Sequence, residues 1–333
     1  MMTSYISEAS YWHEQYQSID LTNARKPFAK TFAFFSANIH QFMPHIPWSK
    51  HEQLFRKMSL YQHLSHLDVE HPYALDQLEL LGWNSSWLAH MKENPGFITC
   101  FHTGAYRLLN LLLAREGLSY ALLLSKQTIK REGRLFLEAY KKYAPAGRFL
   151  LLDAEMSSSI FKIGHLLKDG YNVLAYPDGN MGAANGTANL HQIPFLKHLL
   201  LVRTGIPFLA HLYKKPIYQL NSRRLDTLTV KYDEFNSIIP ETPRQQFIGH
   251  ALKDLYKPLH QLLLHDAGQW TCWPQAHNYM TDAKGLKADP ENPEHWAIFK
   301  QSNQFFLFDK RSYLSYPIDR NELSHYKGKL LLG

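Results

Sequence analysis

The sequence predicts an α/β fold in which helices flank a central, mostly parallel sheet. From about residue 95 onward, short apolar segments alternate with longer segments of helical periodicity, and repeated β-α units of this length favour parallel strands. A helical region precedes this core, and a small β-rich appendage follows it. We therefore expect three parts: an N-terminal helical region (residues 1–90), an α/β core (residues 91–280), and a linker with the C-terminal appendage (residues 281–333).

The expected core elements follow one another in regular order. Apolar runs predict strands over residues 96–101, 120–124, 148–152, 172–176, 206–212, 217–220 and 228–232. Helical spacing predicts helices over residues 105–115, 130–143, 156–168 and 244–265. Pro290 and Pro293 indicate a linker near residues 282–292. Residues 295–308 and 312–316 are the expected strand segments of the appendage.

An aromatic stripe marks the N-terminal region. It recurs at nearly helical spacing through Phe28, Phe32, Phe34, Phe35, Ile39 and Phe42. We expect this stripe to face a protein core. The alternative is a face that touches a membrane surface, which the nearby basic residues Arg25, Lys26 and Lys30 would favour.

The composition of the chain indicates which kinds of binding partner and which cellular compartment to expect. The 333-residue chain carries a formal net charge of +7, but its basic residues are scattered, so nucleic acid is not the favoured partner. An acidic protein or an anionic membrane surface fits this balance equally well. Two cysteines without paired Cys/His spacing predict neither a disulfide framework nor a metal site. Without a secretory signal or a long apolar run, we expect a cytoplasmic protein, with peripheral contact to the inner membrane face left open.

Two segments at predicted strand ends carry the candidate chemistry. His102 follows the first core strand, and Gly104 lets the backbone approach a substrate closely. Asp178 follows the fourth core strand and begins a glycine-containing loop with Gly179. Ligands of open α/β sheets bind at the carboxyl ends of the strands. The position of His102, rather than its residue type, distinguishes it among the 19 histidines of the chain.

Four ordered blocks resemble the lysophospholipid acyltransferase-like superfamily, in particular its lipid A late acyltransferase and mannoside acyltransferase branch. The first is an apolar strand followed by His-x-Gly-x-aromatic, matched by residues 97–106. The second is a Gly, an apolar strand and Pro-Asp, matched by residues 170–178. The third, residues 194–207, ends in Thr-Gly-Ile-Pro, and the fourth is Gln-Trp-Thr-Cys-Trp at residues 269–273. Together the blocks span roughly residues 90–278.

The resemblance implies a thioester-dependent acyltransferase. His102 would be the general base that deprotonates an amine or hydroxyl acceptor, and the acyl or aminoacyl donor would be linked to phosphopantetheine on a carrier protein or coenzyme A. No permanently bound cofactor is expected. Backbone amides at Gly104 or Gly179 would stabilise the oxyanion. Tyr106, Trp270 and Trp273 are candidate substrate-binding residues, the tryptophans as packing residues or as walls of an acyl tunnel. The candidate donor-binding residues are Lys126, Lys130, Arg131 and Arg134.

One position departs from the family pattern. The family has an acid five residues after the histidine, where this chain has Arg107. Three explanations follow: another acid, for which Asp178 is the best candidate, orients His102; Arg107 binds an anionic group of the substrate or carrier arm; or catalysis has been lost and only binding persists.

Cys100 offers a further alternative. Residues i and i+2 share one face of a strand, so Cys100 and His102 could form a pair that holds the acyl group covalently. The competing interpretation is a small buried cysteine in the core.

These observations favour an acyltransferase of bacterial type, acting in lipid or natural-product biosynthesis. The family members that act on lipids carry an N-terminal membrane helix, whereas this chain begins with an amphipathic region. The alternative function is a catalytically inactive module that binds an acyl chain or an acyl or peptidyl carrier protein.

Overall fold

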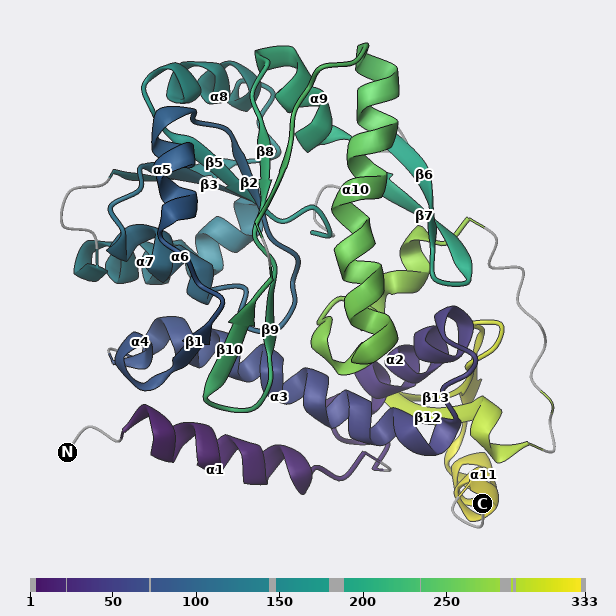
Figure 1. The fold of residues 1–333 in the computed structure, drawn as a ribbon. Coiled ribbons are helices and arrows are strands. Elements are labelled where there is room, and N and C mark those ends of the chain that lie inside the picture. Colours follow the sequence, from purple (N-terminus) through teal and green to yellow (C-terminus); the bar gives the residue numbers. More distant parts are fainter. Residues whose placement is uncertain are drawn as a thin grey trace. The chain divides into compact units, whose positions relative to one another are not determined.

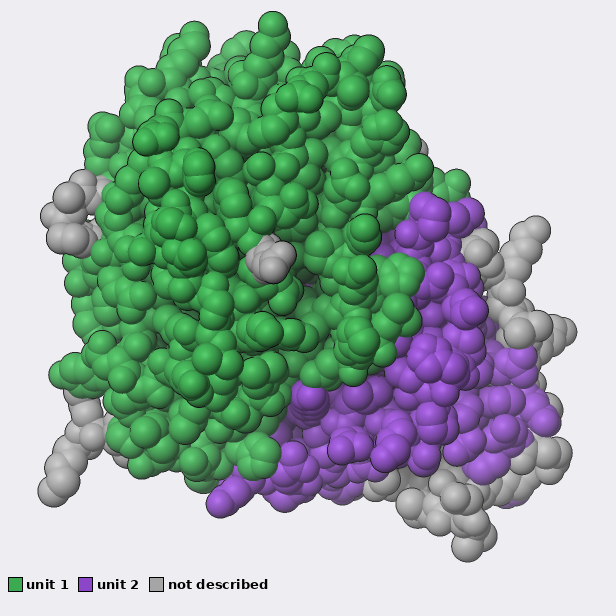
Figure 2. Space-filling model, viewed as in Figure 1, with its two compact units in different colours: residues 1–13, 60–193, 202–270 green, residues 14–59, 194–201, 271–333 purple. Residues whose placement is uncertain are grey.

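The protein is a mixed α/β structure, as the sequence predicts. The computed structural model describes residues 4–21, 23–71, 73–143, 148–179, 189–233, 235–281, 289 and 292–330. The chain forms two compact units, each assembled from several segments (Figure 2). Unit 1 comprises residues 1–13, 60–193 and 202–270, and unit 2 comprises residues 14–59, 194–201 and 271–333. The three-part division expected from the sequence stays a prediction.

The elements are labelled in Figure 1. The α-helices are α1 (Tyr5–Gln17), α2 (Phe28–Phe42), α3 (His51–Glu70), α4 (Ala74–Gln77), α5 (Ser86–Glu93), α6 (Leu108–Arg115), α7 (Lys126–Tyr143), α8 (Ser159–Lys168), α9 (Gly205–Tyr213), α10 (Arg244–His265) and α11 (Arg320–Leu330). The short 3₁₀ helices are η1 (Trp48–Lys50), η3 (Ala267–Gln269), η4 (Trp273–Tyr279) and η5 (Pro293–His295). The strands are β1 (Glu79–Leu81), β2 (Phe97–Thr99), β3 (Tyr120–Leu124), β4 (Phe149–Asp153), β5 (Asn172–Ala175), β6 (Leu190–Phe195), β7 (His198–Arg203), β8 (Ile217–Gln219), β9 (Ser222–Arg224), β10 (Thr229–Tyr232), β11 (Asn236–Ile238), β12 (Trp296–Gln301), β13 (Gln304–Asp309) and β14 (Ser315–Ile318).

Unit 1 contains a six-stranded sheet with the order β11-β8-β2-β5-β3-β4. The pairs β8–β2, β2–β5, β5–β3 and β3–β4 are parallel, whereas β11 runs antiparallel to β8. Ile98 of β2 lies opposite Leu174 of β5, so the loops that follow these two strands leave the same edge of the sheet.

Burial explains why these segments form strands and helices in unit 1. Every residue of β2 and β5 is buried, which is typical of parallel strands covered on both faces. Helix α6 buries its residues from Leu108 through Ala114. Each fully buried leucine there, such as Leu112, stabilises the fold by roughly 1.5–3 kcal/mol.

A second, three-stranded sheet of unit 1, with the order β1-β10-β9, is fixed by a buried charge cluster. Arg224 of β9 is paired with Asp68 of α3 through Nη2 and Oδ2, and both side chains are fully buried. The hydroxyl of Tyr5 donates to the other oxygen of Asp68 at 2.6 Å. Breaking the Arg224–Asp68 pair would leave an uncompensated buried charge.

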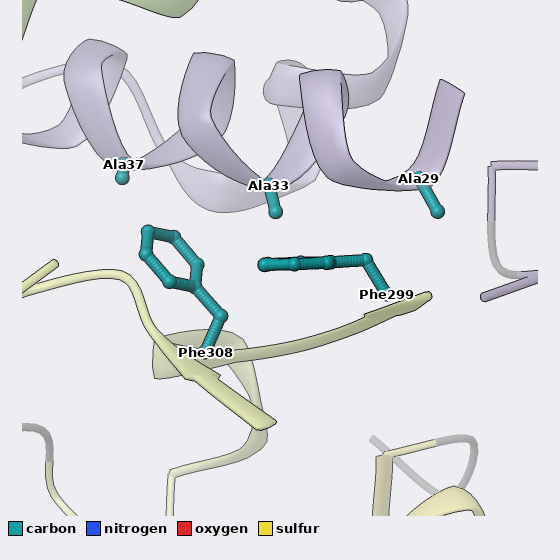
Figure 3. Packing of buried hydrophobic residues seen from close by; sticks show 5 residues of the cluster. All are labelled: Ala29, Ala33, Ala37, Phe299 and Phe308. Atoms are coloured by element: carbon teal, nitrogen blue, oxygen red, sulfur yellow. The ribbon is translucent and has the colours of Figure 1, made fainter. Parts of the chain in front are cut away.

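Unit 2 has its own core, built from α2 and the antiparallel sheet β12-β13-β14. Ala29, Ala33 and Ala37 recur every fourth residue, so they lie along one side of α2. Their small side chains face the rings of Phe299 in β12 and Phe308 in β13 (Figure 3). The alternation of small and large side chains allows the helix and the sheet to approach closely.

The aromatic stripe of α2 faces protein, as expected from its spacing. Phe35, Ile39 and Phe42 are buried, and Phe28, Phe32 and Phe34 are partly buried. Phe28, Phe32 and Phe35 all contact the ring of Phe55 in α3. The predicted core-facing stripe is therefore confirmed, and the membrane-facing alternative is not favoured.

One expected strand is wrong. Residues 206–212 form helix α9 instead of a strand, because a short apolar run does not by itself distinguish a strand from a buried helix. Pro207 lies in the first turn, where it is tolerated in a helix. The helix ends at Tyr213, and Lys214 caps it in the left-handed conformation. The β6–β7 pair was not expected.

The C-terminal segment contains the expected strands, β12 to β14, and in addition helix α11. Most of the expected linker, residues 282–288 and 290–291, lies outside the described residues. Over the described parts of the chain, we find no helix with the length and apolar character needed to span a bilayer.

Candidate active site

His102 and Asp178 meet at the carboxyl edge of the six-stranded sheet of unit 1. The Nδ1 atom of His102 lies 2.8 Å from Oδ1 of Asp178, and the backbone N–H of His102 donates to Oδ2 at 3.0 Å. The Asp178 side chain is 2% exposed, whereas that of His102 is 21% exposed. The structure thus brings together the two residues that the sequence singled out at separate strand ends.

Asp178 receives a third donor from the C-terminal end of unit 1. The indole Nε1–H of Trp270 donates to Asp178 Oδ2 at 2.7 Å. Burial by itself would raise the pKa of Asp178. The charge of His102 and the hydrogen bonds from His102 and Trp270 outweigh this effect and hold the pKa below its ordinary value of 3.8. Asp178 is therefore a carboxylate at neutral pH. In the tautomer that places the proton on Nδ1, His102 donates to this carboxylate and its basic lone pair is on Nε2.

Gly104 is required by the turn that carries His102. Its φ angle is +53°, a left-handed conformation that favours glycine. A Cβ atom at this position would lie 2.7 Å from the Cα of Arg223, so a side chain does not fit. The hydroxyl of neighbouring Thr103 donates to the carbonyl of Ser222 at 2.8 Å. The His102 turn is thus attached directly to the β9 backbone.

Gln269 holds the segment that presents Trp270. Its side-chain oxygen accepts from the Arg224 backbone N–H at 3.0 Å, and its Nε2 donates to the Arg224 carbonyl at 2.7 Å. Its own carbonyl accepts from the Gly104 N–H at 3.2 Å. Gln269 therefore joins β9, the His102 turn and the Trp270 segment. The sequence analysis did not single it out, although its place in the Gln-Trp block was a usable signal.

Two tyrosine rings surround the imidazole. Tyr106 lies 4.6 Å from His102 and Tyr176 lies 4.8 Å from it, measured between ring centroids. The Tyr176 hydroxyl accepts from Asn110 Nδ2 at 3.0 Å, and burial raises the Tyr176 pKa far above its ordinary value. Tyr176 is therefore a neutral wall of the site. Tyr106 was predicted as a substrate-binding residue, whereas Tyr176 was not.

Arg107 lies in a buried ion pair with a residue of another helix. It precedes α6, and its Nη2 and Nε donate to Glu132 Oε2 of α7 at 3.1 and 3.3 Å. Both side chains are 7% exposed. Nη1 of the same guanidinium has no hydrogen-bond partner among the described residues, so the expected role in binding an anionic substrate group stays a prediction. Of the three explanations for Arg107, the geometry fits the one in which Asp178 accompanies His102.

Cys100 does not have the environment of a nucleophile. Strand β2 ends at Thr99, so the strand alternation that would pair Cys100 with His102 does not reach them. The thiol donates to the Phe101 carbonyl at 3.3 Å, and complete burial raises the Cys100 pKa well above its ordinary value. The buried-core interpretation fits this geometry.

The amides expected at an oxyanion hole are engaged elsewhere. The N–H of Gly104 donates to Gln269, and that of Gly179 donates to the Tyr176 carbonyl at 3.1 Å. Neither points to a developing oxyanion in this conformation. The rest of the glycine-containing loop, residues 180–188, lies outside the described residues.

The two tryptophans of the Gln-Trp block differ in environment. Trp270 contacts the carboxylate of the site, which is a more specific role than lining a tunnel. Trp273 belongs to unit 2, where its side chain is fully buried against Phe42 and its carbonyl accepts from Asn38. For Trp273 the packing interpretation fits.

The four expected donor-binding cations all lie on α7 and are exposed. Lys126, Lys130 and Arg134 are spaced four residues apart, so they share one side of the helix. Arg134 pairs with Glu138 at 2.7 Å, and Arg131 pairs with Glu132 at 2.6 Å. Their association with a carrier or coenzyme A stays a prediction.

Neither a protein-family model nor a curated protein matches the chain. The family resemblance therefore rests on the sequence blocks alone.

Proposed function

We propose that the chain is an acyltransferase that moves an acyl or aminoacyl group from a thioester donor to an amine or hydroxyl acceptor. The donor is carried on the phosphopantetheine of a carrier protein or of coenzyme A. The observation that supports this proposal best is the contact between His102 Nδ1 and Asp178 Oδ1. It provides an oriented histidine base at a strand end where the sequence blocks resemble those of an acyltransferase family.

The reaction assigns one role to each residue of the pair. Nε2 of His102 takes the proton of the acceptor amine or hydroxyl as that group attacks the thioester carbonyl. Asp178 holds the Nδ1–H tautomer and stabilises the imidazolium that forms. The tetrahedral intermediate then collapses, the carbon–sulfur bond breaks, and the imidazolium returns the proton to the leaving thiolate. The products are the ester or amide and the free thiol.

The positive face of α7 is the proposed donor site. Carrier proteins are strongly acidic, and Lys126 and Lys130 are exposed cations one turn apart on this helix. Attraction between the opposite charges would bring the carrier to unit 1. This docking would take place at the inner membrane face as readily as in the cytoplasm.

An inactive binding module was the alternative because Arg107 replaces the family acid. Asp178 lies beside His102 in the place of that acid, which answers the reason for that alternative.

The test is a donor and acceptor panel read by intact mass. Purified protein is mixed with acyl carrier proteins and acyl-coenzyme A of several chain lengths, together with amine and alcohol acceptors. We expect loss of the acyl mass from at least one donor, with its gain on an acceptor. The His102→Ala variant should lose this transfer, whereas His13→Ala, at an exposed histidine of α1, should retain it. Equal transfer by wild type and His102→Ala would overturn the proposal.

A further inference from the structure

A polar groove of about 1180 Å³ lies in unit 1, between the β8–β9 segment and α10. The Gln219 Nε2 donates to the Leu255 carbonyl at 2.7 Å, so strand and helix are direct neighbours here. Gln219, Asn221 and Arg223 all line the groove. Their spacing of two residues places them on one face of an extended chain.

Asp233 lines the same groove from the neighbouring strand. Its backbone N–H donates to the Asn221 carbonyl at 3.1 Å, one step beyond the β9–β10 pair Ser222–Tyr232. Residues opposite each other in an antiparallel pair project to the same face. The carboxylate of Asp233 and the amide of Asn221 therefore enter the groove together.

Gln219, Asn221, Arg223 and Asp233 form a polar row along the groove. Three polar atoms in this row lack a hydrogen-bond partner among the described residues. They are Gln219 Oε1, Asn221 Oδ1 and Arg223 Nε, and each is buried. Gln219 is 2% exposed and Asn221 is 7% exposed. The Arg223 Nε lies 3.8 Å from Asp233 Oδ1, too far for a hydrogen bond. Buried polar atoms are normally paired, so this row is suited to a ligand that supplies the missing partners.

The chemistry of the row selects the ligand. Two buried amide oxygens and a carboxylate are acceptors, and together they match the N–H donors of a protonated amine. Arg223 Nε is the remaining donor, and it matches a carboxylate. A phosphate or other simple anion would face the acceptor oxygens. A neutral polyol would provide no opposite charge for Asp233 or for Arg223. Burial also raises the pKa of Asp233, an effect that Arg223 and Lys231 only partly oppose, and a cationic group would favour its ionised form.

We propose that this groove is a binding site for a zwitterionic ligand of the amino-acid type. Its ammonium contacts Gln219, Asn221 and Asp233, and its carboxylate contacts Arg223. The site adjoins the His102 turn, because the Arg223 backbone packs against Gly104. Binding in the groove requires none of the acyl-transfer chemistry proposed above, and it is tested separately.

The test is ligand-observed NMR of the full chain with the twenty L-amino acids. Ethylamine, propionate and glycerol supply the amine, carboxylate and polyol alone. We expect saturable binding of at least one amino acid, with weaker binding of each of the three fragments. Asp233→Asn and Arg223→Gln should each weaken this binding roughly tenfold to a hundredfold, since each removes a charge-assisted hydrogen bond. Both residues are about one-third exposed, so these variants disturb the core little.

Two further variants complete the design. Asn221→Leu removes a buried acceptor and should also abolish binding, and Asn321→Leu, at an exposed position of α11, should not change it. His102→Ala should bind the amino acid as wild type does. Three results would overturn the proposal: no amino acid binds at millimolar concentration, propionate or glycerol binds better than every amino acid, or Asp233→Asn and Arg223→Gln leave binding unchanged.

Discussion

Asp178 binds His102 through both carboxylate oxygens: Oδ1 contacts the ring Nδ1 at 2.8 Å, and Oδ2 accepts the backbone N–H at 3.0 Å. One carboxylate therefore fixes both the backbone position of His102 and the orientation of its ring. The two residues are 76 positions apart in the chain, and parallel pairing of β2 with β5 brings them together.

Replacing Asp178 with Asn should lower the rate of acyl transfer by about 10²–10⁴-fold. The amide does not stabilise an imidazolium and allows the wrong imidazole tautomer. The measurement is kcat with an accepted donor, together with the melting temperature of the variant. A folded Asp178→Asn protein with wild-type kcat would show that this contact has no part in catalysis.

Trp270→Phe should weaken the site electrostatically with little change in side-chain shape. It removes a hydrogen bond to an ionised group, worth about 1.5–3 kcal/mol. Since that bond helps to lower the Asp178 pKa, the pKa of Asp178 should be higher in the variant. A carboxylate with a lowered pKa stabilises the fold above pH 3.8, and this contribution is lost as the pH falls through the folded value. The difference in unfolding free energy between Trp270→Phe and wild type should therefore be largest at pH 7 and become smaller in acidic solution. Urea unfolding at several pH values measures this difference.

Trp83→Phe is the matched control for this experiment. Trp83 also lies in unit 1, but its Nε1 has no hydrogen-bond partner among the described residues. Its replacement should not produce a stability difference that depends on pH below 5. If the two tryptophan variants behave alike, the Trp270–Asp178 hydrogen bond has no measurable electrostatic effect.

Arg107→Met should destabilise the protein by about 1.5–3 kcal/mol, because it removes one of the two cations paired with the buried Glu132 and leaves only Arg131. Adding Glu132→Leu should recover much of this loss, since a buried ion pair and an apolar pair of similar volume are often comparable in stability. Chemical unfolding of wild type, the two single variants and the double variant provides a double-mutant cycle for this ion pair. The double variant should keep its KM for the donor, and a large rise in that KM would instead indicate that Arg107 binds substrate.

Charge reversal on α7 should weaken carrier docking. Lys126→Glu with Lys130→Glu should raise the KM for an acyl carrier protein several-fold without changing kcat, and the effect should diminish at high salt. Lys141→Glu, an exposed position near the other end of α7, is the control. An equal rise in KM for both variants would mean that the net charge matters rather than this face.

Unit 2 should lose stability in moderately acidic solution. His51 is buried, which lowers its pKa from 6.5 to about 3, and Ser36 hydrogen-bonds its Nδ1 at 2.9 Å. A histidine with a lowered pKa favours the folded state fully above pH 6.5, and this contribution is lost as the pH falls toward the folded value. His51→Asn should therefore reduce the loss of unfolding free energy between pH 6.5 and 3 by about 2–4 kcal/mol. An unchanged pH profile would show that His51 is already protonated in the folded protein.

The sequence predicted local elements well where a single pattern was present. Residues 120–124 and 244–265 form a strand and a helix with the expected bounds, because alternation of buried strands and amphipathic helices is encoded locally. The strand predicted for residues 206–212 was wrong, since this short and mostly apolar segment does not distinguish a strand from a buried helix. The pairing of β6 with β7 was missed because His191 and Gln192 interrupt the apolar pattern of β6, and the apolar run of β7, residues 199–202, was not assigned to an element.

The candidate site could be predicted only in part. His102 and Asp178 follow strands, and strand ends of a parallel sheet converge, so their proximity was within reach of the sequence. The Trp270–Asp178 hydrogen bond and the Arg107–Glu132 pair depend on side-chain contacts 92 and 25 residues apart in the chain. No local pattern encodes such contacts. The sequence therefore located the site but not the network that holds it.

The most direct test of the central claim is single-turnover transfer from a preloaded donor, with wild type and His102→Gln compared at saturating protein. Glutamine keeps a polar side chain at this position but does not act as a base. We expect His102→Gln to bind the donor normally and to transfer the acyl group at least about a hundredfold more slowly, the usual effect of losing a general base. Transfer at the wild-type rate would contradict this expectation.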